Sequence, residues 1–511
     1  MTRLAATNDH DRPKARPVEE REPRLSEPRV LRCVVSFAQW SILIGALFAV
    51  WAVAMGVVIV MQRRSAAATI AWLLLLAFLP VIGWIVYRFI GPRRLARRRI
   101  RRQVSRKLVL EAVGTMNEIS TESPMRHREQ LARIAIVAGE SPPLRADALE
   151  LYLDGAAMYA AMASAIAAAK HHVHVEFYIW ENDRIGVKLR DQLVERARAG
   201  VAVRVIVDGT GASSVRGKFF APLVAAGGHV AWFNPIRLFR IRRPRADFRT
   251  HRKIVICDGR VGLTGGMNIA DDHSAEFVGE RAWRDTHLRI EGSAVRALQR
   301  VFVEDWLFAS EEMLQISDEE LFPVPQAVGP EVVQIVASGP DLDVFAIHKV
   351  FFAAINQAVK RVWLTTPYLV PDEAIQTALV SAAMRGIDVR LIVPSKSDSK
   401  LVDLAARSFY PELLDSGARI HEYQPCFIHA KTFVVDDDVA IIGTANLDNR
   451  SFRLDFEVVA VVYGDEFTAK LAAAFEHDLT HCIEITQQAV GRQRFLTRLG
   501  QGVARLLSPL L

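Results

Sequence analysis

Two stretches of the chain carry the same set of side chains, and that set could act on a phosphate ester. In each stretch a histidine is followed two residues later by a lysine and five residues after that by an aspartate. A glycine-containing turn and an asparagine come about ten residues further on. The residues are His251, Lys253, Asp258 and Asn268 in the first copy, and His429, Lys431, Asp436 and Asn446 in the second. Such a specific spacing, found twice, indicates an internal duplication.

The order of these residues predicts a β-hairpin that presents polar groups at one end. Histidine and lysine two apart point to the same face of a strand. The apolar runs 254–257 and 433–435 predict the buried remainder of each strand, and a turn leads to a second strand that ends near the asparagine. Two copies facing one another would surround one pocket with two imidazoles, two ammonium groups and two amides.

That pocket suits a phosphodiester. Lysine and asparagine would hold the non-bridging oxygens, one histidine would attack phosphorus, and the other would protonate the leaving oxygen. The chemistry needs one neutral and one charged histidine, and this predicts a bell-shaped pH–rate profile.

The elements that must position these groups are also repeated. From about residue 149, helical and strand-like runs alternate in the same order twice, and each series ends in the histidine–lysine hairpin. This alternation predicts an α/β fold with mostly parallel sheets flanked by helices. The predicted boundaries are 141–310 for the first repeat, 311–340 for a linker and 341–485 for the second repeat.

The N-terminal part has a different composition. Residues 1–32 are charged and predict a disordered cytoplasmic tail. Residues 34–61 and 65–87 contain no charged side chain, and each run exceeds the ~20 residues that an α-helix needs to cross a bilayer. They predict an α-helical transmembrane hairpin over 33–88. A basic membrane-proximal linker, 89–140, follows, and its arginines place both termini and the repeats in the cytoplasm by the positive-inside rule.

The composition points to acidic partners. The formal net charge is +7 and the pI is about 9.3, values that favour membrane lipids, nucleic acid or phosphorylated substrates. The four cysteines have neither metal-site nor disulfide spacing. His171, His172 and His174 are expected at the surface because they stand at the start of a predicted strand, and their spacing matches no zinc site.

Two basic stretches leave alternatives open. Six arginines between 237 and 249 precede the first motif, and they form either a lip that attracts anionic headgroups or a solvated loop. Residues 486–511 have leucines at helical spacing, and they predict an amphipathic helix that lies in the membrane interface or docks on the core.

The paired motifs resemble those of the phospholipase D superfamily, and the chain resembles the bacterial cardiolipin synthases within it. Three further segments carry the likeness: the predicted hairpin from Arg64, WRDTHLRIEG at 283–292, and GTANLDNRSFRLDFE at 443–457. The resemblance implies two phospholipase-D-like repeats packed as a pseudo-twofold bilobed unit, with the active site at their interface. It also implies transfer through a phosphohistidine with no cofactor and no metal.

The resemblance also implies a role for each site residue. His251 is expected to be the nucleophile and His429 the general acid and base, with Lys253, Lys431, Asn268 and Asn446 around the phosphoryl oxygens. Each histidine needs an acceptor for its other nitrogen, and the matching positions are Asp285 for His251 and Glu457 for His429. Asp258 and Asp436 complete the catalytic signature, but they are expected to shape the turns rather than to touch phosphorus. Gly266 stands where many relatives have serine, and this is expected to cost a single hydrogen bond.

The expected activity is therefore that of a cardiolipin synthase of the inner membrane, which joins two phosphatidylglycerols and releases glycerol. A phospholipase D hydrolase is the alternative. A nuclease is disfavoured because it gains nothing from membrane spans, and intact motifs in both copies argue against a scaffold. The acceptor, the identity of the nucleophilic histidine and the oligomeric state are left open by the sequence.

Overall fold

The computed structural model describes residues 29–62, 66–90, 107, 128–139, 142–234, 248–314, 320–323, 329–341 and 344–510. The chain forms two compact units, Met1–Gly91 and Pro92–Leu511. Residues 1–28 of the predicted tail and most of the predicted basic linker lie outside the described residues, whereas residues 29–32, predicted as disordered, belong to a helix.

The N-terminal unit contains one long apolar helix, α1, Arg29–Val60. Its segment Gln39–Val60 is, among the described residues, the helix long and apolar enough to cross a membrane. The expected helix over 65–87 is instead divided into α2, Ala66–Phe78, and α3, Pro80–Ile90. Proline has no N–H to donate and clashes with the preceding turn, so Pro80 explains the break. A second crossing stays a prediction.

The first repeat is built on a seven-stranded sheet in the order β2-β8-β7-β6-β3-β4-β5. The strands are β2 (Ala148–Tyr152), β3 (His172–Phe177), β4 (Ala202–Asp208), β5 (His229–Phe233), β6 (Lys253–Cys257), β7 (Val261–Gly265) and β8 (His287–Glu291).

The second repeat is built on a nine-stranded sheet in the order β1-β9-β17-β15-β14-β10-β12-β13-β18. Its strands are β1 (Leu144–Ala146), β9 (Glu331–Ser338), β10 (Arg361–Thr365), β12 (Asp388–Pro394), β13 (Arg419–Tyr423), β14 (Thr432–Val435), β15 (Val439–Gly443), β17 (Glu457–Tyr463) and β18 (Cys482–Ile485). Within it, β17-β15-β14-β10-β12-β13 repeats the order β8-β7-β6-β3-β4-β5. The predicted duplication is thus confirmed.

The sheets are mixed, and the expectation of mostly parallel sheets was wrong. Strands β3, β4 and β5 are parallel, and so are β10, β12 and β13. The motif hairpins β6–β7 and β14–β15 and their neighbours β8 and β17 are antiparallel. The reason is local: a turn of a few residues can only return the chain antiparallel to itself.

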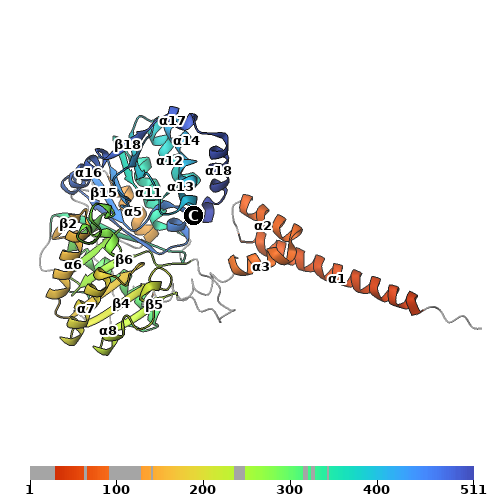
Figure 1. Cartoon of the computed structure of the whole chain (residues 1–511), viewed down its shortest axis with the longest axis horizontal. Helices are drawn as coiled ribbons and strands as arrows, with labels where there is room; N and C mark the ends of the chain where they lie inside the picture. Colours follow the sequence, from red (N-terminus) through yellow and green to blue (C-terminus); the bar gives the residue numbers. More distant parts are fainter. Residues whose placement is uncertain are drawn as a thin grey trace, which may run out of the picture. The chain divides into compact units, whose positions relative to one another are not determined.

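Helices cover the outer face of each sheet, and a shared core joins the inner faces (Figure 1). In the first repeat α6, α7 and α8 contribute to the outer core; in the second, α11, α12, α13 and α14 do. The shared core contains residues of β6, β8, β15 and β17 together with α10 and α16. Burial on both faces explains why these strands are almost entirely apolar in sequence.

The helices of this unit are α5 (Glu129–Gly139), α6 (Gly155–Ala168), α7 (Arg184–Arg198), α8 (Ala221–Ala225), α9 (Ala275–Val278), α10 (Val295–Ser310), α11 (Ala346–Gln357), α12 (Glu373–Met384), α13 (Lys400–Arg407), α14 (Tyr410–Asp415), α15 (Asn449–Arg453), α16 (Asp465–Leu479), α17 (Gln487–Gly491) and α18 (Phe495–Leu506). Helix α5 buries Leu131, Ala132 and Ala135 in the core of the second repeat, so the fold begins inside the segment predicted as a linker.

Candidate active site

The two motif histidines lie where the repeats meet. The N–H of His251 donates to the carbonyl of Phe456, and that of Phe456 donates to Arg249. In the mirrored arrangement, the N–H of His429 donates to the carbonyl of Arg284, and that of Arg284 donates to Phe427. Each histidine precedes the first strand of its hairpin and is bonded through its backbone to the other repeat. The site is therefore built at the interface, as expected.

Each imidazole is held by a carboxylate of the opposite repeat. Nδ1 of His251 lies 3.0 Å from Oε1 of Glu457 and 3.1 Å from the carbonyl oxygen of Thr444. Nδ1 of His429 lies 2.7 Å from Oδ2 of Asp285. The expected pairing of His251 with Asp285 and His429 with Glu457 was therefore wrong. Its physical reason is that the residue before each carboxylate pairs with the segment before the other repeat's histidine, Arg284 with Ile428 and Phe456 with Thr250.

This pairing fixes the tautomers. The carbonyl oxygen of Thr444 can only accept from Nδ1 of His251, so this nitrogen carries the proton. The same holds for His429 beside an ionised Asp285. In both residues Nε2 then keeps its lone pair for chemistry.

The lysines of the motifs lie beside the histidines, and the asparagines are buried nearby in the chain. Nζ of Lys253 donates to the carbonyl of His251 at 2.7 Å, and Nζ of Lys431 donates to that of His429. Asn268 and Asn446 are buried beyond the hairpins. The predicted set of two imidazoles, two ammonium groups and two amides is thus buried at one interface.

Burial lowers the pKa of both motif lysines and of both motif histidines. It lowers the pKa of Lys253 to about 8 and that of Lys431 to about 7. It also lowers the pKa of His429 to about 3, with Lys431 adding to the effect, and it holds the pKa of His251 well below its usual value. Both imidazoles are therefore neutral in the empty site near pH 7, and a bound anion would raise the pKa of each.

The two carboxylates differ. Burial raises the pKa of Glu457 to about 7, opposed by the charge of Lys253. Burial alone would also raise the pKa of Asp285, but the interactions with His429 and Lys431 outweigh it and hold that pKa below its usual value. Asp285 is thus the firmly ionised partner, and His429 beside it is the better placed to carry a proton.

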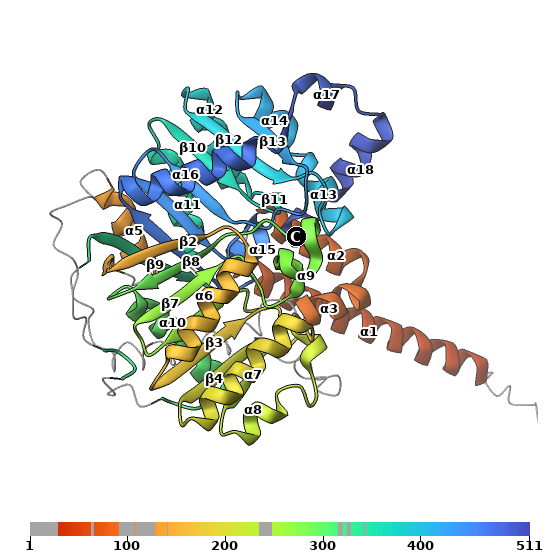
Figure 2. The same ribbon diagram turned by 60° about the vertical axis from the view of Figure 1, so that its left-hand side comes forward.

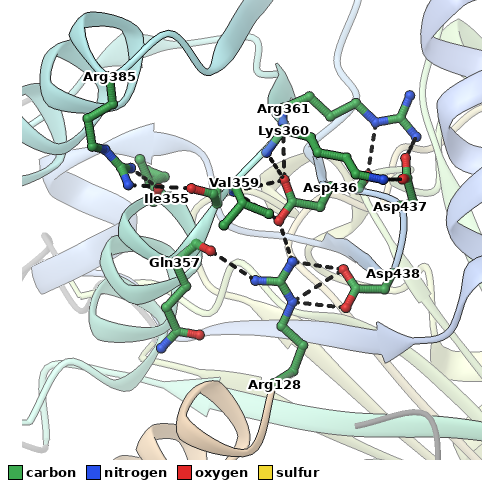
Figure 3. Close-up of polar contacts among 11 residues, drawn as sticks. Arg128, Ile355, Gln357, Val359, Lys360, Arg361, Arg385, Asp436, Asp437 and Asp438 are labelled. Atoms are coloured by element: carbon green, nitrogen blue, oxygen red, sulfur yellow. Dashed lines mark hydrogen bonds and ion pairs between the residues drawn. The ribbon is translucent and has the colours of Figure 1, made fainter. Parts of the chain in front are cut away.

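The motif aspartates bind backbone and stand apart from this chemistry. Asp258 accepts from the amides of residues 170–172 at 2.8–2.9 Å. Asp436 accepts from those of residues 359–361 and also from the buried guanidinium of Arg128 (Figure 3). Both adopt left-handed backbone conformations, with φ of 54° and 51°. These contacts confirm that the aspartates shape the turns.

The position of Gly266 has no room for a side chain, so more than the loss of a hydroxyl distinguishes it from serine. A Cβ there would lie 2.1 Å from Oδ1 of Asp285, and that oxygen also accepts from the N–H of Thr286 at 2.7 Å. At the equivalent place in the second repeat, the hydroxyl of Thr444 donates to Glu457. Asp285 therefore accepts a hydrogen bond from a backbone N–H, whereas Glu457 accepts one from a side-chain hydroxyl.

Sequence reasoning missed three residues of the site. His273 lies buried beside Asp285 and accepts from the N–H of Asn268. Ser451 accepts from the N–H of Asn446, and Arg252 bonds to the carbonyl of Glu457 across the interface at 3.2 Å. His273 and Ser451 both follow the motif asparagine by five residues, a signal that aligning the two copies could have revealed.

The histidines at the start of β3 also differ from expectation. His172 and His174 are buried and bonded to Gln299, while His171 is exposed. Strand β3 is buried on both faces, because its apolar side chains lie in the outer core and His174 stacks on Phe302 of α10. Of the arginines predicted to form a lip, those from 237 to 245 lie outside the described residues, and Arg249 is buried 3.4 Å from Asp208.

Comparison with known proteins identifies relatives of both parts of the chain. Residues 162–306 and 351–479 match the family described as cardiolipin synthase, PLD-like domain, and residues 47–92 match the family described as phospholipase D-nuclease N-terminal. Cardiolipin synthase 1 of Bacillus anthracis is 38% identical over 478 residues, which cover 92% of this chain and 94% of that protein. A cardiolipin synthase of Geobacillus kaustophilus is 39% identical over 457 residues, covering 89% and 91%.

A solved structure confirms the fold. The phosphatidylserine synthase of Haemophilus influenzae Rd KW20 matches with a TM-score of 0.58 and 15% identity, covering 75% of this chain and all of that one.

Proposed function

The chain belongs to the cardiolipin synthases of the phospholipase D superfamily, and we propose that it transfers a phosphatidyl group from one phosphatidylglycerol to another. The observation that carries this proposal is the crossed pair of histidines, each with Nδ1 held by a carboxylate of the other repeat and Nε2 left with a lone pair. Such a pair supplies a nucleophile and a proton donor to one phosphorus atom.

In the first step, Nε2 of His251 attacks phosphorus while the bond from phosphorus to the glycerol oxygen breaks. His429, protonated once the anionic lipid is bound, gives its proton to that oxygen, and glycerol leaves. Lys253, Lys431, Asn268 and Asn446 hold the non-bridging oxygens as charge develops on them.

In the second step, a hydroxyl of another phosphatidylglycerol attacks the phosphohistidine. His429 takes the hydroxyl proton, the phosphorus–nitrogen bond breaks, and cardiolipin forms. The assignment of His251 as nucleophile is supported by the asymmetry of the carboxylates, because the firmly ionised Asp285 favours the charged state of His429. A hydrolase would differ only in the use of water in this step.

Membrane association is supported by the apolar helix Gln39–Val60 and by the match of residues 47–92 to the N-terminal family. We infer that α2 and α3 complete a second crossing and that the repeats lie in the cytoplasm of the bacterial cell. Two lipid substrates in one bilayer favour this arrangement over a nucleic acid substrate.

The test is to incubate proteoliposomes with isotopically labelled phosphatidylglycerol and to follow the products by mass spectrometry. We expect doubly labelled cardiolipin and free glycerol from the native chain and from His229→Ala, which alters an exposed histidine far from the motifs. Neither product is expected from His251→Ala or His429→Ala. Phosphatidic acid without cardiolipin would show that the enzyme is a hydrolase.

A further inference from the structure

The C-terminal helix α18 presents an apolar stripe that the described residues of its own unit, Pro92–Leu511, leave exposed. Its exposed members recur at helical spacing, while Gln501 and Ala504 on the opposite side are buried and α18 packs against α13. The stripe continues onto α13, and Figure 2 shows the two helices side by side. We name this the C-terminal apolar face: Leu401, Leu404, Phe495, Leu496, Leu499, Val503, Leu506 and Leu507.

The surroundings of this face are basic. Between residues 485 and 511 there are four arginines, Arg492, Arg494, Arg498 and Arg505, and neither aspartate nor glutamate. Arg492, Arg494 and Arg498 are exposed. An apolar stripe flanked by arginines is typical of a helix that lies in the interface of an anionic bilayer.

The face is also joined to the active site. After α18 the chain forms a short 3₁₀ turn, Ser508–Leu510, whose Ser508 carbonyl accepts from the amide of Asn449 at 3.1 Å. Asn449 begins α15, directly after the short strand β16, Leu447–Asp448, that follows Asn446. Strand β16 pairs with β11, Leu369–Val370, which contacts α13.

We propose that the C-terminal apolar face docks on the surface of an anionic bilayer and holds the active site at the level of the lipid headgroups. Both the phosphatidyl donor and the acceptor keep their acyl chains in the membrane, so docking would let their headgroups enter the site without extraction. The proposal rests on the proposed lipid substrate and goes beyond it in assigning the surface through which the lipid arrives.

The first test measures the activity of the full-length double variant Leu499→Glu/Val503→Glu on two substrates. One is a lipid held in vesicles, and the other is a lipid dissolved in water without detergent. With long-chain phosphatidylglycerol in vesicles, cardiolipin formation should fall on the order of tenfold, because two apolar side chains no longer insert. With a short-chain, monomerically dissolved phosphatidylglycerol the rate should be unchanged. The matched control is Val359→Glu, at a side chain that is 73% exposed outside the face.

Equal loss on both substrates, or no loss on either, would overturn the docking proposal. A native chain that makes no cardiolipin from either substrate would instead overturn the proposed function, so the two failures are distinguishable.

The second test measures insertion directly in nanodiscs. A fluorophore on Leu499→Cys, in a chain whose four native cysteines are alanine, should be quenched by spin-labelled lipid when the disc contains phosphatidylglycerol. The same fluorophore on Val359→Cys should not be quenched. Lack of quenching at 499, or cross-linking of 499 to a second copy or to the N-terminal unit, would overturn the proposal.

A separate observation concerns His273, whose imidazole lies beside Asp285 in the candidate active site. Nε2 of His273 accepts from the N–H of Asn268 at 3.2 Å, so the proton of the neutral ring is on Nδ1. That Nδ1 lies 3.7 Å from Oδ2 of Asp285, the oxygen that accepts from His429. In the second repeat Ser451 occupies the equivalent place, between the N–H of Asn446 and Glu457.

We infer that His273 is a positioning residue that steadies Asp285 against His429 by closing the 3.7 Å gap when substrate binds. The ligand atoms of His273, Asp285 and His429 lie within 4.8 Å of one another, a spacing that could also hold a metal ion. The positive charges of Lys253 and Lys431, which act on both His273 and His429, disfavour a further cation there.

The test uses two substitutions and a pH profile. His273→Phe should lower kcat about tenfold with little change in KM, the lower end of the loss expected when a partner that orients a functional side chain is removed, and should shift the acidic limb of the kcat profile. His273→Asn keeps an acceptor for Asn268 and a donor for Asp285. It should therefore restore most of the native kcat and most of the native acidic limb. Identical behaviour of the two variants, or activity that is lost on chelation and regained with a metal, would overturn this inference.

Discussion

At the scale of single residues, the motif lysines and Glu457 are the site groups whose charge changes near neutral pH. Burial lowers the pKa of Lys431 to about 7 and that of Lys253 to about 8. An ammonium is charged below its pKa and neutral above it, so kcat/KM for phosphatidylglycerol should fall as the pH rises through this range. Lys431→Arg keeps a cation at all these pH values. It should therefore move the basic limb of the kcat/KM profile to higher pH, even if the maximum kcat/KM falls.

The measurement is the pH profile of kcat/KM, which reports groups of the free enzyme. Lys218→Arg, at an exposed lysine, should leave the profile unchanged. A basic limb at the same pH in Lys431→Arg would show that this lysine does not set it.

Gly266 supports a second prediction at this scale. Because a Cβ would lie 2.1 Å from Oδ1 of Asp285, Gly266→Ser should displace this carboxylate and lower kcat by about a hundredfold, the lower range for loss of a general acid and base. Thr444→Gly removes a hydroxyl without adding bulk and should cost far less. Equal activity of Gly266→Ser and the native enzyme would contradict the prediction.

At the scale of elements, the hairpins were predictable because their signals are local. The apolar run after each motif lysine and the turn residues beyond it lie within a few positions of one another. The crossed contacts of Asp285 and Glu457 were not predictable in this way, since the strands that carry them meet only after the repeats pack. The break at Pro80 was visible in the sequence, but the absence of charge over 65–87 outweighed it in the interpretation.

The turn at Asp436 allows a prediction about stability. Asp436→Ala removes the acceptor for three backbone amides and for Arg128, and alanine disfavours the left-handed backbone at this position. We expect a loss of about 3 kcal/mol in the free energy of unfolding. Thermal unfolding followed by circular dichroism would measure it.

The neighbouring Asp437→Ala is the control. Asp437 forms half-exposed ion pairs with Lys360 and Arg361, and such surface pairs contribute about 0–1 kcal/mol. Similar unfolding temperatures for the two variants would show that the motif aspartate does not stabilise the turn.

At the scale of the whole molecule, the duplication made the bilobed catalytic unit predictable, but not its exact composition. Strand β1 and helix α5 come from before and around the predicted start of the first repeat, yet both pack with the second. Neither has a counterpart that the repeat could reveal. The amphipathic sequence of α18 left open whether the helix docks on the core or lies in the membrane interface. The structure is compatible with both, since α18 docks on α13 and still presents an exposed apolar face.

The proposed membrane topology yields the last prediction. If α1 and the bent pair α2–α3 both cross, Gln62 between them faces the outside of the cell, and Gln493 lies in the cytoplasm with the repeats. A membrane-impermeant maleimide should then label Gln62→Cys in intact spheroplasts, but Gln493→Cys only after permeabilisation, in chains without the native cysteines. The arginines after residue 88 favour this result, because positive charge is retained on the cytoplasmic side. Labelling of both variants in intact spheroplasts would place the catalytic unit outside and show that α2 and α3 return to the side from which they entered.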